Sequence, residues 1–151
     1  MSVFHAFNIS ASGLTSQRLR MDVAASNMAN AQTTRATIDE NGEFQPYQRK
    51  MLTMQPNNQK FKHFLHKAQA GRKQPTEGVK VTQIVQDQEP FKLIYEPSHP
   101  DANEAGYVAY PNVDPLKEMV DMMSATRSYE ANVTALNATK DMLLKALEIG
   151  K

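Results

Sequence analysis

The sequence predicts a mainly α fold with a small β part, in which two long terminal helices pair as an antiparallel, coiled-coil-like hairpin. Near both ends, side chains recur at alternating steps of three and four, mostly apolar, and such a narrow stripe on a helix packs against another helix. The middle holds β-branched runs and most of the prolines. We therefore expect helices within residues 1–34 and 114–151, joined by an extended or β-hairpin middle segment at 35–113.

The N-terminal helix is expected from about Val3 to Asn30, and its stripe consists of Phe7, Ala11, Leu14, Arg18, Met21, Ala25 and Met28. Its first turns contain glycine, serine, asparagine and threonine. Glycine costs about 1 kcal/mol relative to alanine inside a helix, and the polar residues cost a few tenths each. This helix must therefore be held by packing. The turn-forming run from Asn30 to Thr34 ends it.

The middle segment reads as strands and loops. Residues 44–54 are extended, with Pro46 limiting them to an edge or bent strand. Residues 79–85 and 91–95 have strand composition, and the short linker between them predicts that they form a hairpin. Residues 97–115 include four prolines and form an irregular connection. The basic stretch 60–73 is expected to be a loop that extends from the middle segment, with a short helix as the alternative.

The C-terminal helix has clear boundary signals. Asp114 can cap it, Pro115 suits its first position, and Gly150 can end it. Its stripe consists of Met119, Met122, Thr126, Tyr129, Val133, Leu136, Lys140, Leu143 and Leu147. From the two stripes we predict a helix-packing and subunit interface: Phe7, Leu14, Met21, Met28, Met119, Met122, Tyr129, Val133, Leu136, Leu143 and Leu147.

Charge and composition limit the class of protein. The net charge of +1 argues against a whole-chain electrostatic partner such as DNA. Residues 44–76 hold seven basic and no acidic residues, while residues 77–121 hold nine acidic and three basic ones. These blocks either attract each other, within a chain or between copies, or form two solvated faces. No apolar run is long enough for a membrane span, and the N-terminus lacks the pattern of a cleaved signal peptide, so we expect any export to use another route.

Candidate catalytic, cofactor-binding and metal-binding residues are not found. The chain has no cysteine, and His63 and His66, three residues apart, lack a third metal ligand. The aromatic residues Phe61 and Phe64 lie within the basic stretch 60–73, a pattern that could bind an anionic polymer such as nucleic acid or a cell-wall polymer. Three hypotheses follow: a structural subunit, an anion-binding module and a small enzyme. Binding by charge weakens steeply with salt, whereas apolar helix packing does not.

Three segments resemble proteins of the bacterial flagellum. Residues 26–34 are similar to the SNxANxxT signature that follows the first helix of rod and hook axial proteins, with Ser26, Asn27, Ala29, Asn30, Thr33 and Thr34 in the signature positions. Residues 95–113 and 118–132 resemble, more selectively, the proximal-rod members of that family. The likeness covers about the first fifty residues and everything from Gly78 onward. Gln32 stands where the family usually has asparagine, and residues 60–73 have no counterpart.

The resemblance implies a structural role without enzymatic activity or cofactor. Such proteins are exported by the flagellar type III apparatus without signal-peptide cleavage. They polymerise across the periplasm into a helical tube that transmits torque, and their terminal helices line the export channel. The expected partners are copies of the chain, other proximal rod proteins, the distal rod protein, and FliE, which joins the rod to the MS ring. Neither nucleic-acid binding nor membrane insertion is expected.

Overall fold

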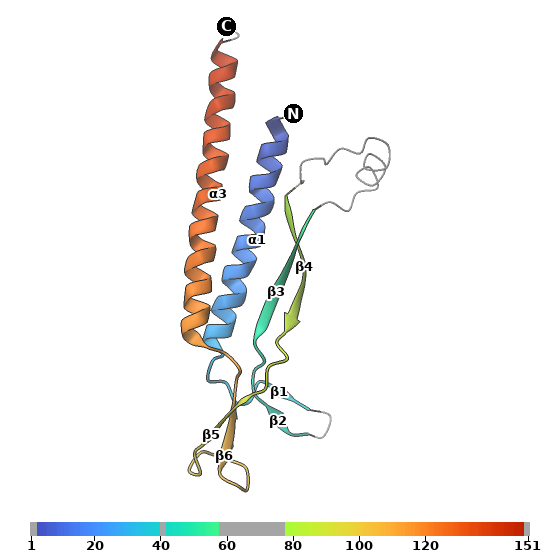
Figure 1. Cartoon of the computed structure of the whole chain (residues 1–151), viewed down its shortest axis with the longest axis vertical. Coiled ribbons are helices and arrows are strands. Elements are labelled where there is room, and N and C mark those ends of the chain that lie inside the picture. Colours follow the sequence, from blue (N-terminus) through green and yellow to red (C-terminus); the bar gives the residue numbers. More distant parts are fainter. Residues whose placement is uncertain (1–2, 40–41, 58–77, 150–151) are drawn as a thin grey trace, which may run out of the picture. The chain divides into compact units, whose positions relative to one another are not determined.

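The computed structural model describes residues 3–39, 42–57 and 78–149. Figure 1 shows helix α1 (Val3–Ala29), strands β1 (Thr37–Ile38), β2 (Phe44–Gln45), β3 (Lys50–Pro56), β4 (Val79–Gln86), β5 (Lys92–Tyr95) and β6 (Tyr107–Tyr110), and helix α3 (Pro115–Ile149). The predicted fold class, mainly α with a small β part, is confirmed. The chain divides into unit 1 (Met1–Leu19, Thr53–Gln83, Ala125–Lys151) and unit 2 (Arg20–Leu52, Ile84–Ser124), and each receives part of both helices.

Both terminal helices begin and end close to their predicted positions. Helix α1 ends at Ala29, directly before the turn-forming run. Helix α3 begins at Pro115, and Asp114 caps it: its Oδ1 accepts from the Leu116 N–H at 3.0 Å and its carbonyl from the Glu118 N–H at 3.0 Å. The predicted terminator, Gly150, lies outside the described residues. The helices pack together, and in unit 2 contacts join Arg20 to Asp121 and Asn27 to Glu118, so they run antiparallel there.

Small and hydroxylated residues let α1 form and pack in unit 1. The hydroxyls of Ser12, Thr15 and Ser16 donate to the backbone carbonyls three or four residues earlier, at 2.7–3.0 Å. These bonds satisfy polar groups that would otherwise compete with the helix. Gly13 faces α3 so closely that an added Cβ would lie 2.9 Å from Asn132 Oδ1. The composition that weakens α1 in isolation therefore permits a close approach of α3.

The strands pair differently from the sequence prediction. Strand β1 pairs with β2 and β5 with β6, both antiparallel, while β4 pairs with β3. The predicted hairpin between residues 79–85 and 91–95 is therefore wrong. The Asp87 N–H bonds to the Arg49 carbonyl at 2.8 Å, which continues the β3–β4 pairing into the presumed hairpin linker. The predicted extended run 44–54 is divided into β2 and β3 around the buried Pro46. The basic loop 60–73 lies outside the described residues.

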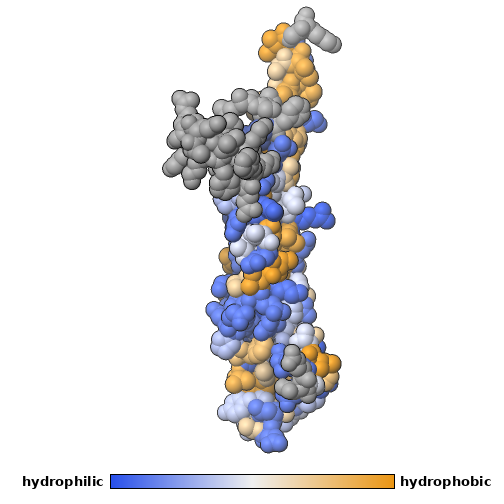
Figure 2. Space-filling model, turned by 90° about the vertical axis from the view of Figure 1, so that its right-hand side faces the viewer, coloured by the Kyte–Doolittle hydropathy of each residue, from blue (hydrophilic) through white to orange (hydrophobic). Residues whose placement is uncertain are grey.

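The buried apolar core is small. Among the described residues, five hydrophobic residues are buried: Ala24, Tyr47, Val108, Val113 and Ala125. Eighteen large hydrophobic residues are exposed, and Figure 2 shows apolar surface gathered around the end of α3. In the described part of the chain, large apolar side chains are therefore fully exposed far more often than they are fully buried.

The turn before β6 supplies a stability prediction. Gly106 has a φ of +80°, and a Cβ there would lie 2.9 Å from Tyr95 Cε2. A left-handed conformation costs a non-glycine residue about 1–2 kcal/mol, and the ring contact adds to this. We expect Gly106→Ala to lower the free energy of unfolding by about 2–3 kcal/mol, as measured by urea denaturation. Gly42, with a φ of +82° and no atom within 4 Å of its added Cβ, is the control. An equal loss in Gly42→Ala would show that the Tyr95 ring contributes nothing.

Candidate functional site: a buried polar joint and two helix faces

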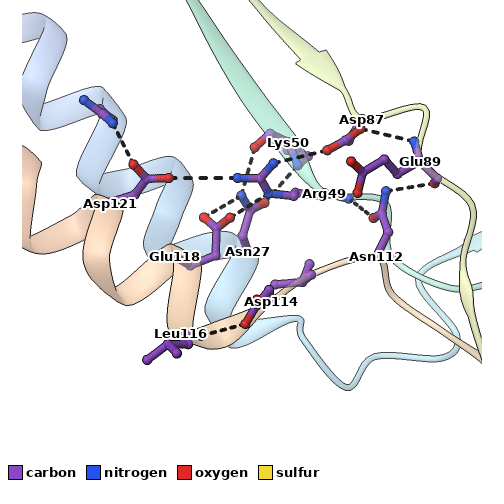
Figure 3. Close-up of polar contacts among 12 residues, drawn as sticks. Asn27, Arg49, Lys50, Asp87, Glu89, Asn112, Asp114, Leu116, Glu118 and Asp121 are labelled. Atoms are coloured by element: carbon purple, nitrogen blue, oxygen red, sulfur yellow. Dashed lines mark hydrogen bonds and ion pairs between the residues drawn. The ribbon is translucent and has the colours of Figure 1, made fainter.

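Five polar side chains in unit 2 form a connected cluster where the two helices meet the middle segment. We call this cluster the polar joint, and it consists of Asn27, Arg49, Asp87, Asn112 and Glu118. Figure 3 shows the Arg49 guanidinium between Asp87 on one side and Glu118 on the other. The members come from α1, the residue before β3, the residue after β4, the connection before α3, and α3 itself. Residues far apart in sequence are thus held at one point.

Asn27 uses its full hydrogen-bonding capacity. It is 1% exposed, and its Nδ2 donates to the Lys50 carbonyl at 2.8 Å and to Glu118 Oε2 at 3.0 Å. Its Oδ1 accepts from the Tyr47 hydroxyl at 3.0 Å and from the Lys50 N–H at 2.9 Å. A side-chain amide offers two donor hydrogens and two acceptor lone pairs, and here all four are used. Neither an aspartate nor an apolar side chain can reproduce this set.

Arg49 neutralises two buried carboxylates. Its Nε donates to Glu118 Oε1 at 2.6 Å and its Nη1 to Asp87 Oδ2 at 3.1 Å. The side chains of Arg49, Asp87 and Glu118 are only 12%, 10% and 3% exposed. Burial alone would lower the pKa of Arg49, but its bonds to Glu118 and Asp87 outweigh this effect and raise that pKa. The Glu89 N–H, followed by Arg49, lowers the pKa of Asp87.

Asn112 connects the loops around this ion pair. Its Oδ1 accepts from the Arg49 N–H at 2.8 Å, and its Nδ2 donates to the Glu89 carbonyl at 3.0 Å. Nearby, Lys92 Nζ donates to the Val113 carbonyl at 2.8 Å. The backbone before β3, after β4 and before α3 is thereby fixed by side chains, in addition to the backbone bond between Asp87 and Arg49.

The signature segment 26–34 has a structural role at nearly every polar position. Asn30 Nδ2 donates to the Ser26 carbonyl at 2.9 Å, and the Thr33 hydroxyl donates to Asn30 Oδ1 at 3.3 Å. The Thr34 hydroxyl donates to Asp101 Oδ2 at 2.7 Å. Ala29 is exposed and is the last residue of α1. The segment therefore ends α1 and fastens the following chain to the loop before β6.

The predicted packing residues fall into two groups in the single chain. Most are half-buried: Phe7, Leu14, Met21 and Met28 on α1, and Met122, Tyr129, Val133, Leu136 and Leu143 on α3. Met119 and Leu147 are exposed. The covered stripe of α3 also passes through Ala125 and Thr139 rather than through the adjacent Thr126 and Lys140 of the predicted stripe. Whether these residues contact other subunits stays a prediction.

The sequence prediction missed the ion-pair members of the joint. In the sequence, Arg49 belongs to the basic block 44–76, and Glu118 and Asp87 belong to the acidic block 77–121. The proposed attraction between those blocks within a chain was the available signal, and the Arg49 pairs are an instance of it. Asn112 and Asp101 lie in the segment 95–113 that resembles proximal-rod proteins, but nothing in the sequence indicates which groups they contact. Their partners are set by loop geometry.

Metal ligands and membrane-spanning helices are two other features that bear on function. Within residues 3–39, 42–57 and 78–149, no group of three or more potential metal ligands occurs. The pair His63 and His66 lies outside that part of the chain. None of the helices described is both long enough and apolar enough to cross a bilayer. The joint itself offers hydrogen bonds and ion pairs, which position segments of the chain.

The lowered pKa of Asp87 predicts an acid dependence of stability. Because its folded-state pKa lies below the ordinary 3.8, the carboxylate stabilises the fold above pH 3.8, and this contribution is lost as the pH falls through the folded value. We expect Asp87→Asn to be less stable than the unchanged chain at pH 6, with the difference narrowing below pH 3.8. Urea midpoints measured across this range test it. A difference that stays constant with pH would contradict the assignment.

Comparison with known proteins identifies the family. A model described as "Flagella basal body rod protein" matches residues 7–37, and one described as "Flagellar basal body rod FlgEFG protein C-terminal" matches residues 104–149. The flagellar basal-body rod protein FlgC of Bacillus subtilis is 58% identical over 151 residues, 100% of both chains. FlgC of Escherichia coli O6:H1 is 42% identical over 151 residues, again 100% of both. FlgC of Borreliella burgdorferi is 40% identical over 160 aligned positions, 99% of this chain and 98% of that protein. The chain therefore belongs to the FlgC family of flagellar basal-body rod proteins.

Proposed function

We propose that this structural rod subunit belongs to the proximal rod, where its terminal helices polymerise with those of its neighbours into a helical tube. The tube encloses the export channel and transmits motor torque, and the subunit has no enzymatic activity. The observation that carries the proposal is the excess of exposed over buried large apolar side chains, combined with membership of the FlgC family.

The exposed apolar residues of α3 lie in two groups suited to neighbours. In unit 2 they are Leu116, Met119, Val120 and Met123, spaced along one side of the helix. In unit 1 they are Met142, Leu144, Leu147 and Ile149. Burying one large apolar side chain contributes about 1.5–3 kcal/mol, so covering either group favours association strongly. Large exposed apolar patches mark interaction surfaces in soluble proteins.

The proposed neighbours follow from the family. They are copies of the chain, the other proximal rod proteins, the distal rod protein and the adaptor FliE. The proposed location is the basal body, in the part of the rod that crosses the periplasm. The proposed route is the flagellar type III export apparatus, without a cleaved signal peptide.

Complementation tests this function directly. The gene is placed in a motile bacterium from which its own FlgC-family gene has been deleted, and purified basal bodies are imaged at side-chain resolution. We expect swimming to return and the chain to occupy the proximal rod. Basal bodies with complete rods that lack the chain would overturn the proposal.

A salt series separates the rod subunit from an anion-binding module. Purified rods are washed at increasing ionic strength, and the retained chain is quantified. Apolar packing keeps the chain in the rod at high salt, whereas attachment through the basic stretch 60–73 to an anionic polymer is lost.

A further inference from the structure

Burying the charged side chains of the polar joint costs free energy. Moving a charged group out of water costs several kcal/mol even in a real protein, and pairing often does no more than offset that cost. Arg49, Asp87 and Glu118 are all nearly buried, in a chain that leaves many apolar side chains exposed. In other proteins, replacing a buried ion pair by apolar residues of similar size is often neutral for stability. Stability alone therefore does not account for the joint.

The directional geometry of hydrogen bonds is a better explanation of the polar joint. Hydrogen bonds require a narrow range of distances and angles, whereas apolar contacts tolerate rotation and slip. The planar guanidinium of Arg49 reaches one carboxylate on α3 and another after β4. The amide of Asn27 reaches α3 and both backbone groups of Lys50. Each bond therefore constrains a different pair of segments.

A shift of α3 by one residue along α1 would break several hydrogen bonds of the joint at once. It would separate Glu118 from both Asn27 and Arg49, and leave a carboxylate that is 3% exposed without its partners. An uncompensated buried charge costs several kcal/mol. Alternative registers of α3 are thus excluded, even though the polar joint adds little net stability to the correct register.

We propose that the polar joint is an orientation device of unit 2. It fixes the register of α3 against α1 within that unit, and the path of the chain directly before β3, directly after β4 and directly before α3. Its importance for assembly rests on the proposed rod function, because each repeated subunit would multiply an angular error. The orientation itself is a property of the single chain.

A triple substitution tests the proposal on the purified chain. Arg49→Met, Glu118→Gln and Asp87→Asn remove all three charges, while the glutamine keeps an acceptor for Asn27 Nδ2 and the asparagine keeps one for the Glu89 N–H. Since the chain has no cysteine, Leu93→Cys on β5 and Val120→Cys on α3 place two spin labels at unique exposed sites of unit 2. The distance distribution between the labels is then measured, together with the thermal midpoint.

We expect the label distances to spread at least about twofold more widely in the triple variant, with a thermal midpoint within about 4 °C of the unchanged chain. Removal of the exposed Lys145–Glu148 ion pair by Lys145→Met and Glu148→Gln is the control, and should leave the width unchanged. An unchanged width in the triple variant would overturn the proposal. A fall of the midpoint by more than about 10 °C would also overturn it, by showing the joint to be a stabilising element. Failure of the rod function would instead appear as absence of the unchanged chain from basal bodies.

Discussion

Arg49→Met alone should lower the free energy of unfolding by about 3–5 kcal/mol, because it leaves buried carboxylates without their counter-charge. Glu118 and Asp87 are 3% and 10% exposed and both accept from Arg49. Asp121, whose Oδ2 lies 3.9 Å from Arg49 Nη2, is itself an anion, and the cation Arg20 is already engaged by it at 2.7 Å. Urea denaturation followed by circular dichroism measures the loss.

Two further variants make this result specific. Arg35 pairs with Asp101 but is half-exposed, so Arg35→Met should cost about 1 kcal/mol or less. Arg49→Lys should recover only part of the loss, since a single ammonium cannot span both carboxylates as a guanidinium does. Equal losses in Arg49→Met and Arg35→Met would mean that the joint is no more than a surface ion pair.

Leu136→Asp should abolish rod assembly while leaving export intact. Leu136 is half-buried on the covered stripe of α3 in unit 1, between Val133 and Leu143. Burial of a leucine contributes about 1.5–3 kcal/mol, and an unpaired buried carboxylate costs several more. This loss recurs at each equivalent contact of the proposed tube. Cell fractionation is the measurement, with the variant expected in the periplasm or medium and no rod in purified basal bodies.

The neighbouring position provides the control. Asn137 is exposed, and Asn137→Asp adds the same charge one residue further along α3. It should assemble normally, while Leu143→Asp should behave like Leu136→Asp. Normal rods containing Leu136→Asp would show that this covered stripe is not needed for assembly, and would refute its proposed role in subunit packing.

The helices could be predicted because their signals are local. Asp114 and Pro115 specify the start of α3 within one turn, and the run after Ala29 specifies the end of α1. Strand partners depend on distant residues instead. Residues 79–85 and 91–95 are adjacent in sequence, yet β4 pairs with β3 and β5 with β6. Asp87 resembles a turn residue, and only the position of Arg49 shows that it is a buried ion-pair partner.

The polar joint shows the same limit. The signature segment could be located in the sequence, but the four bonds of Asn27 involve Tyr47, Lys50 and Glu118, whose proximity arises only on folding. The stripe of α3 was displaced by one residue at Ala125 for a related reason. Periodicity predicts that a helix has a covered face, while the shape of the opposing helix decides which of two adjacent residues is covered.

The hydroxyl groups of α1 have a mechanical consequence. Ser12, Thr15 and Ser16 donate to carbonyls of their own helix, so those donors make no demand on a neighbouring molecule. Ser16 is only 3% exposed, and the Ser12 hydroxyl also accepts from the Val79 N–H at 3.1 Å, so these groups lie against the chain's own unit 1. Around Gly13, helix α1 is therefore held to α3 by close fit, whereas in the polar joint of unit 2 it is held by directional bonds. One helix is thus positioned by shape along one part of its length and by hydrogen bonds along the other.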